Sequence, residues 1–145
     1  MPKIMKSLNN ISRCQSVFRN ARLGARGLCA FHHAYVLAIA RMAGCSQEEL
    51  ARELCLNKST VTRALSQLEE DGYITRAPKP EDKRCVLVYP TEKLLSVLPA
   101  VRAVSVQWNS LIAAGVSEGE LEVFYRVLLQ MEQNAKAVAS ECREG

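Results

Sequence analysis

The chain has 145 residues, of which 48% are hydrophobic and 23% charged, and its formal net charge is +4. These proportions are those of an average globular domain, so they exclude a disordered, collagen-like or low-complexity chain. No apolar run approaches the ~20 residues of a bilayer span, and the N-terminus lacks the apolar stretch of a signal peptide, so we expect a cytoplasmic protein with no membrane partner.

The first 45 residues predict two helices and carry seven Lys or Arg without a single Asp or Glu. Apolar residues recur at helical spacing from Ile4 to Leu23, and two glycines then interrupt the pattern. A second periodic stretch runs from about Cys29 to Met42, and Gly44 follows as a stop signal. Its expected buried residues are Phe31, Tyr35, Val36, Ile39 and Ala43.

Two shorter helices follow in close succession. Ser46 and Glu49 have the S-x-x-E spacing of a capping box, and Asn57 can cap the next helix. A tight connection between two such helices predicts a helix-turn-helix. The second helix has an apolar stripe at Val61, Ala64, Leu65 and Leu68. This stripe leaves a polar outer face made of Lys58, Ser59, Thr60, Thr62, Arg63, Ser66 and Gln67.

After Gly72 the pattern becomes β-prone over residues 73–76 and 85–89, which predicts a hairpin with a charged tip between the two runs. Three cations, Lys79, Lys83 and Arg84, are expected at this tip. An arginine on a narrow ribbon can enter a DNA minor groove, where negative potential is concentrated. Asp82 opposes such a role unless it orients an arginine. An ordinary charged turn and a solvated helix face are the alternative interpretations.

The C-terminal third predicts two long helices. Thr91 can cap a helix over residues 92–114, and Ser117 with Glu120 forms a second capping box before the last helix. Both helices carry apolar seams with alternating spacings of three and four residues. The seams are Leu94, Val97, Val101, Val104, Trp108 and Leu111, then Leu121, Phe124, Leu128, Met131, Ala135 and Val138. They exceed the need of one small domain, so we expect a homodimer.

We therefore predict a mainly α fold (an α+β winged helix), in which a winged helix-turn-helix is flanked by long dimerisation helices from both termini. One compact domain is expected to contain three regions. Residues 1–45 are N-terminal helices for dimerisation and support, residues 46–93 form the DNA-binding winged helix-turn-helix, and residues 94–145 are C-terminal dimerisation helices.

The outer face of the fourth helix suggests its partner. Short hydroxyls, an amide and two cations near a helix N-terminus suit phosphate contact and base reading in a DNA major groove. A winged-helix adaptor that binds protein would instead present an acidic or apolar face there. The sequence has no nucleophile triad, glycine-rich phosphate loop or metalloprotease motif, so we expect neither an enzyme nor a cofactor.

Residues 46–93 resemble the MarR family of bacterial transcription regulators. The resemblance lies in N-K-S-T-V-T-R, then L-E-x-x-G-x-I-x-R, then D-x-R, which in this chain is Asp82 and Arg84. It implies a homodimeric regulator that binds a pseudo-palindromic operator in double-stranded DNA, with a reading helix beginning at Asn57. Members often have an acid where Lys79 stands, and a glycine where Leu94 stands.

The resemblance also implies control of the regulator by a ligand. The family often binds small aromatic or carboxylate compounds, which implies here a repressor released by such an effector. The corresponding pocket residues are Arg22, Phe31, His32, Tyr35 and Trp108, unless these residues are simply core.

Two other forms of control are thiol-based redox sensing and metal sensing. Some members sense peroxides through a cysteine of the first helix, here Cys14. That residue lies on the stripe between Ile11 and Phe18, where a thiol is usually inert. His32 and His33 point about 100° apart on a helix, so they cannot chelate one metal ion from the same face, and no metal site is expected.

Overall fold

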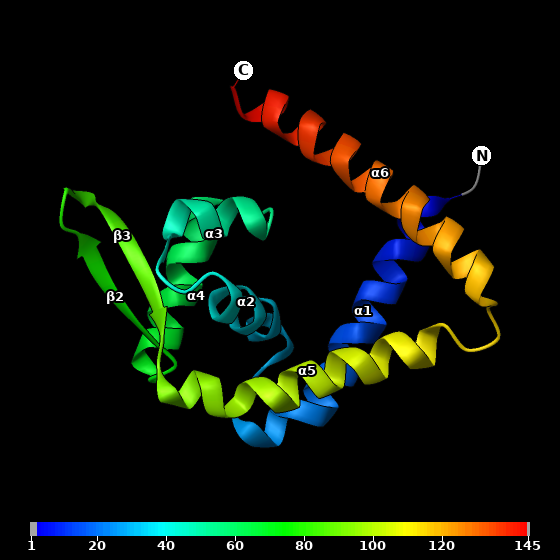
Figure 1. The fold of residues 1–145 in the computed structure, drawn as a ribbon, viewed down its shortest axis with the longest axis horizontal. Coiled ribbons are helices and arrows are strands. Elements are labelled where there is room, and N and C mark those ends of the chain that lie inside the picture. Colours follow the sequence, from blue (N-terminus) through cyan, green and yellow to red (C-terminus); the bar gives the residue numbers. More distant parts are fainter. Residues whose placement is uncertain (1–2, 145) are drawn as a thin grey trace. The chain divides into compact units, whose positions relative to one another are not determined.

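The computed structural model describes residues 3–144, apart from the side chains of residues 30, 31, 143 and 144. Within these residues helices alternate with a small antiparallel sheet (Figure 1). The helices are α1 (Ile4–Leu23), the 3-10 helix η1 (Gly24–Arg26), α2 (Ala30–Arg41), α3 (Gln47–Glu53), α4 (Lys58–Glu70), α5 (Glu92–Ile112) and α6 (Glu118–Glu144). The strands are β1 (Cys45–Ser46), β2 (Ile74–Lys79) and β3 (Asp82–Pro90). The predicted winged-helix fold is confirmed, with η1 and β1 as elements that the sequence patterns did not indicate.

The helix-turn-helix forms because each of its helices has a local start signal. The Ser46 hydroxyl accepts the Glu49 amide at 3.1 Å, while the Glu49 carboxylate accepts the Ser46 amide at 2.7 Å, which completes the predicted capping box. The Asn57 side chain accepts the Thr60 amide at 2.8 Å and starts α4. Between α3 and α4, Cys55 has a φ of 55°, a left-handed conformation that turns the chain back on itself.

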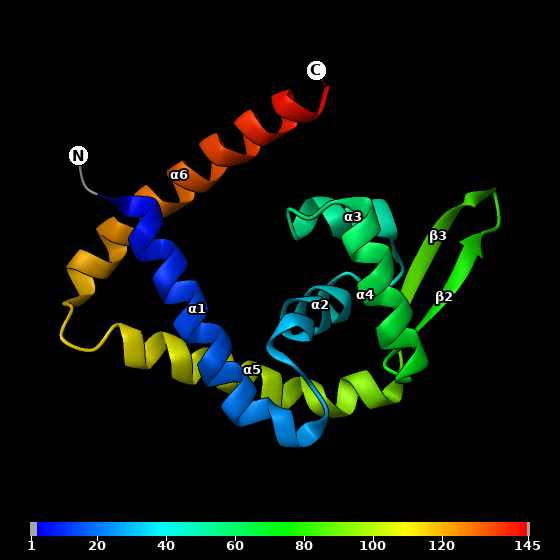
Figure 2. The ribbon, with the colours of Figure 1, turned by 180° about the vertical axis from the view of Figure 1, so that it is seen from behind.

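The wing is a pair of strands, and the prediction of a long charged tip is wrong. β2 and β3 continue through most of residues 77–84, so that only Pro80 and Glu81 connect them (Figure 2). The strand order is β1–β3–β2, which makes β2 an edge strand, and its pairing is irregular between Pro78 and Lys79. An edge strand with such an irregularity tolerates proline, because not every amide is needed in the ladder.

One hydrophobic core holds the winged part together. The predicted stripe of α4 is buried along its whole length, and its residues belong to one cluster with residues of α2, α3, the sheet and α5. Of the α5 seam, Leu94, Val101 and Val104 are buried in this core of the single chain, whereas Leu111 is 55% exposed. Ala43 was expected in this core, but it is exposed because α2 ends two residues earlier.

The chain divides into two compact units, one up to Trp108 and one from Asn109 onward. The core just described lies in the first unit. The second unit consists of the end of α5 and of α6, whose first turn is capped by the predicted pair Ser117 and Glu120. Two seam residues of α6, Phe124 and Val138, remain 55% and 59% exposed, because a single helix offers nothing to cover them. Within residues 3–144, no helix has both the length and the apolar character needed to cross a membrane.

Candidate nucleic-acid interface

The outer face of α4 carries the predicted polar residues. Asn57 and all seven outer-face residues of α4 are exposed, except Thr60, which is half-buried. The hydroxyls of Thr62 and Ser66 each donate to the carbonyl four residues earlier, at 2.9 Å. Each of these side chains is therefore tied to its own helix and points its remaining surface outward.

The charged and amide side chains of α4 are also positioned locally. Arg63 Nε donates to the carbonyl of Ser59 at 3.3 Å, and Gln67 Nε2 donates to Asp71 at 3.1 Å. The first turn of α4 contains no acidic residue. The positive end of the helix dipole and the nearby cations therefore act together on any anion at this helix end.

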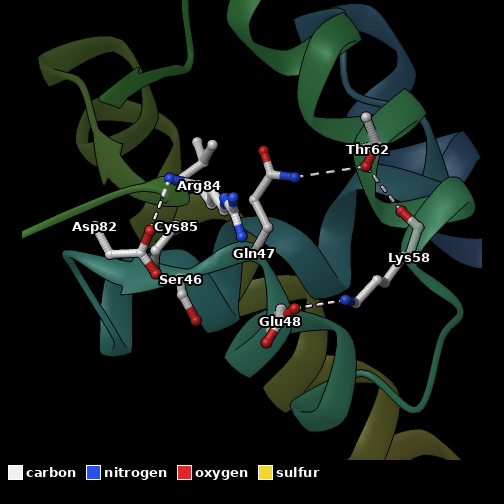
Figure 3. A pocket seen from close by; sticks show the side chains of 9 residues that line it. Ser46, Gln47, Glu48, Lys58, Thr62, Asp82, Arg84 and Cys85 are labelled. Atoms are coloured by element: carbon white, nitrogen blue, oxygen red, sulfur yellow. Dashed lines mark hydrogen bonds and ion pairs between the residues drawn. The ribbon is translucent and has the colours of Figure 1, made fainter. Parts of the chain in front are cut away.

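A groove of about 400 Å³ separates the start of α4 from the wing (Figure 3). It is lined by Ser46, Gln47, Glu48, Lys58, Thr62, Asp82, Arg84, Cys85 and Val86. Alternation along β3 places Asp82, Arg84 and Val86 on the same face. The structure thus brings the wing arginine and the predicted reading helix to the two sides of one groove.

Asp82 has a structural role beside Arg84. Its carboxylate accepts the backbone amide of Arg84 at 3.0 Å (Figure 3). This bond holds the backbone of the strand at Arg84, because it joins the amide and not the guanidinium. Lys79 and Lys83 lie on the ends of β2 and β3 rather than in a loop, and Lys79 Nζ is 3.9 Å from Glu81.

Lys58 forms an ion pair across the groove entrance with Glu48 of α3 (Figure 3). The hydrogen bond from Lys58 holds the pKa of Glu48 below its usual value. The lysine side chain is 75% exposed, and ion pairs at such exposure contribute little to stability. Lys58 can therefore exchange this carboxylate for a phosphate at small cost.

The sequence patterns gave no role to Arg76, which connects the wing to the helix-turn-helix. Its guanidinium donates to Glu69 at 2.8 and 3.0 Å, to Gln47 at 3.3 Å and to Ser66 at 3.3 Å. These bonds from Arg76 lower the pKa of Glu69. The spacing along β2 could have indicated this role. Arg76 lies two residues after the buried Ile74, and alternation along a strand puts both on the inward face. An arginine on that face needs a carboxylate.

Gln47 bridges the same network to the reading helix. Its Oε1 accepts from Arg76, while its Nε2 lies 3.5 Å from the hydroxyl of Thr62 (Figure 3). Wing strand, α3 and α4 are thus linked by one chain of hydrogen bonds next to the groove.

Of the five residues considered for an effector pocket, Arg22 and Trp108 contact the same aromatic ring. The Cζ atom of Arg22 lies 5.1 Å from the centroid of the Phe18 ring. The ring of Trp108 packs on the same ring, with 5.4 Å between the two centroids. His32 and Tyr35 are buried in the helical core. The side chain of Phe31 lies outside the described part of the structure.

The two histidines have different surroundings. His32 contacts Cys29, whereas His33 Nε2 is 3.1 Å from the Ser105 hydroxyl of α5. Among the described residues, no group of three or more His, Cys, Asp or Glu side chains is placed to hold a metal ion. Cys14 was expected among packed residues but is exposed, because its face of α1 is not covered within the chain.

Comparison with known proteins agrees with this geometry. Residues 32–86 match the model of the MarR family. The HTH-type transcriptional regulator YybA of Bacillus subtilis (strain 168), itself uncharacterized, is 25% identical over 134 residues, which are 92% of this chain and 89% of YybA.

Solved structures extend the likeness to nearly the whole chain. The crystal structure of MarR is 29% identical, with a TM-score of 0.84 over 97% of this chain and 95% of that one. A MarR-family regulator from Listeria monocytogenes, complexed with a 26mer DNA, has the same fold at 23% identity, with a TM-score of 0.93 over 100% and 97% of the two chains. The family comprises transcriptional regulators and not enzymes. The winged helix therefore matches the model of the MarR family over residues 32–86, and nearly the whole chain is similar in sequence and fold to the solved MarR structure.

Proposed function

We propose that this regulator binds double-stranded DNA as a homodimer, at a pseudo-palindromic operator, and represses transcription until a small aromatic or carboxylate effector releases it. The observation that carries DNA binding is the groove between α4 and β3, which presents the polar face of α4 on one side and Arg84 on the other. An α-helix of this kind fits the major groove, and an arginine on a ribbon fits the adjacent minor groove.

Each residue of the interface has a proposed task. Ser59, Thr62 and Arg63 read base edges, together with Ser66 and Gln67, while Lys58 holds a phosphate. Asn57 and Thr60 order the start of the helix, where backbone amides face the DNA backbone. On the wing, Arg84 enters the minor groove with Asp82 holding it, and Lys79 and Lys83 contact phosphates.

Selection of bound fragments from random duplex DNA tests this proposal. We expect a palindromic consensus whose half-sites are one helical turn apart, since two copies present two reading helices. Arg84→Ala should then weaken binding most where the flanks of the half-sites are rich in A·T pairs. The absence of any enriched sequence with the unmodified protein would refute sequence-specific binding.

The occupant proposed for the apolar faces of α1 and α6 is a second copy of this chain. Exposed apolar residues lie on both helices, including Met5 and Val17 on α1 and Phe124 and Tyr125 on α6. The charges are complementary, because α1 carries cations without an acid while α6 is rich in glutamate. Sedimentation at micromolar concentration tests this assembly, and a stable folded monomer would contradict it.

The effector is proposed to bind near Phe18, where the cation of Arg22 and the ring of Trp108 both make contact. At such a site the cation can pair with the carboxylate of a ligand, and the protein's aromatic rings can stack on the aromatic ring of the ligand. Titrating salicylate while following Trp108 emission and DNA release tests this site. Saturable quenching with weaker DNA binding supports it, and Arg22→Met should remove both. Quenching without a change in DNA affinity would contradict control by the effector. A ligand that binds the DNA-binding and the released state equally does not shift the equilibrium between them.

A further inference from the structure

A thiol and an imidazole lie together at the start of α2. Cys29 is the N-cap residue of this helix and is exposed, and its Sγ lies 3.4 Å from Nδ1 of His32. The imidazole itself is only 8% exposed. The backbone amide of His32 donates to the Cys29 carbonyl at 3.0 Å, so the first helical turn holds the two side chains together.

The surroundings of the pair act on a proton transfer from sulfur to nitrogen in two directions. Burial, the larger effect, lowers the pKa of His32, which favours the neutral imidazole with a ring nitrogen that can accept a proton and also makes it a weaker base. The Asp71 carboxylate acts in the opposite direction and stabilises the imidazolium that would form. The Cys29 side chain caps no amide, and the first turn of α2 has no acidic residue, so a thiolate meets only the positive end of the helix.

The other cysteines lack this arrangement among the described side chains. Cys14, Cys55 and Cys142 are exposed, while the two histidines of the chain contact Cys29 and Ser105. Cys45 is buried. Cys29 is therefore the thiol that combines access to solvent with an adjacent base.

We propose that Cys29 is a reactive thiol that adds to soft carbon electrophiles, such as conjugated carbonyl compounds, with His32 as its base. The thiol proton moves to Nδ1 of His32, and the sulfur electron pair forms a bond to the β-carbon of the electrophile. The electrons of the carbon–carbon double bond move toward the carbonyl as an enolate, and the imidazolium returns the proton to the α-carbon. The adduct contains every atom of both reactants, so the step needs no oxidant, leaving group or second thiol.

An adduct at Cys29 has a direct route to the DNA interface. The segment just before it contacts the connection between α4 and the wing, because the Tyr73 hydroxyl donates to the Arg26 carbonyl at 3.4 Å. Asp71, whose charge acts on His32, is the C-cap of α4. Breaking the contact between Cys29 and His32 therefore disturbs the junction of the reading helix and the wing. We expect weaker DNA binding after modification. This expected loss of affinity rests on the proposed function, whereas the reactivity of the thiol does not.

The rate of labelling at each cysteine tests the chemistry without DNA. The full chain is treated with limiting N-ethylmaleimide at pH 7, and peptide mapping by mass spectrometry follows all six cysteines in one sample. Cys29 should react about tenfold faster than the exposed thiols of Cys55 and Cys142, and His32→Asn should slow Cys29 alone by a similar factor. Equal rates at Cys29, Cys55 and Cys142, or an unchanged Cys29 rate in the variant, would overturn the proposal.

A second measurement remains decisive if His32→Asn disturbs folding, which rapid labelling of the buried Cys45 would reveal. In the unmodified protein, the ratio of the Cys29 rate to the Cys55 rate should rise as the pH falls from 8 to 6, because only Cys29 has a base to receive its proton. A constant ratio would refute the role of His32.

The coupling to DNA needs one more comparison. After labelling, the unmodified chain should lose affinity for its selected DNA, while Cys29→Ser, labelled in the same way, should retain it. If Cys29 reacts selectively and affinity does not change, the coupling is refuted and the reactive thiol stands. If the unlabelled chain selects no DNA at all, the proposed function fails by itself.

Discussion

The helices α4 and α6 are both amphipathic, but α4 buries its apolar stripe within its own compact unit, whereas α6 has exposed stripe residues in the second unit. Its Val61 and Leu65 are 1% and 0% exposed, since α2, α5 and the sheet pack around them. On α6, Phe124 and Val138 are more than half exposed. Helical periodicity therefore shows where an apolar face lies, but not whether the same chain covers it. The exposed apolar face of α6 is the surface on which the proposed second copy packs.

The polar faces of the two helices differ as well. The first turn of α4 is free of acids, whereas Glu118 and Glu120 lie in the first turn of α6. Negative charge at a helix start stabilises the helix itself, and its absence leaves that end open to an external anion. The helix proposed to read DNA is thus the one that has not neutralised its own positive end.

The largest effect is expected from a charge placed on the uncovered face. Leu128→Asp should abolish dimerisation, because an unpaired buried charge costs on the order of 3–5 kcal/mol. Sedimentation of the variant should give a monomer or an unfolded chain. Gln133→Asp adds the same charge on the polar side of α6 and should leave the dimer intact. A dimer of undiminished affinity in Leu128→Asp would remove the seam from the interface.

Acid should weaken the covered part of the molecule through His33. Burial, and next the charge of Arg19, lower the pKa of His33 to about 4, while the unfolded imidazole titrates near 6.5. The unfolded chain therefore binds more protons between these values, so stability falls as the pH decreases from about 6.5 to 4. The loss is on the order of 3 kcal/mol. Urea unfolding at fixed protein concentration measures it.

The variant His33→Gln separates this histidine from the carboxylates. Glu69, whose pKa is lowered by Arg76, also loses stabilisation in acid, and it remains in the variant. We expect a clearly smaller fall in stability for His33→Gln over the same pH range. Equal slopes for the two proteins would exclude His33 as the source.

On the DNA-facing side, Arg63→Ala should cost about 1–3 kcal/mol and relax preference at one position of each half-site. Fluorescence anisotropy with a series of single-base operator variants measures both quantities. Arg102→Ala, which removes an exposed arginine of α5, is the matched control for charge. A loss that is equal on all sequences would make Arg63 a phosphate contact instead of a reader.

The smallest effect is expected at the end of the wing. Lys79→Ala should weaken binding to all DNA about equally and reduce the slope of log affinity against log salt by about one for each subunit. The ion pair of Lys79 with Glu81 is long at 3.9 Å and so competes little with phosphate. An effect confined to one operator sequence would contradict the assignment.

Local chemistry alone was enough to predict the helices and the reading face. The capping bonds of Ser46 with Glu49 and of Asn57 with Thr60 join residues three apart, so the order of residues specifies them directly. The buried stripe of α4 and its polar outer face follow from helical periodicity in the same way.

Tertiary structure decided what depends on residues far apart in the chain. The wing is longer than predicted because pairing with β3 outweighs the turn tendency of Pro78 on an edge strand. β1 has only two residues and exists because β3 pairs with it. Arg76 donates a hydrogen bond to Gln47, which lies 29 positions away in the sequence. Cys14 of α1 is exposed, although the apolar spacing around it predicted packing. Propensity is a property of a segment, whereas pairing and burial are properties of the neighbours that the fold supplies.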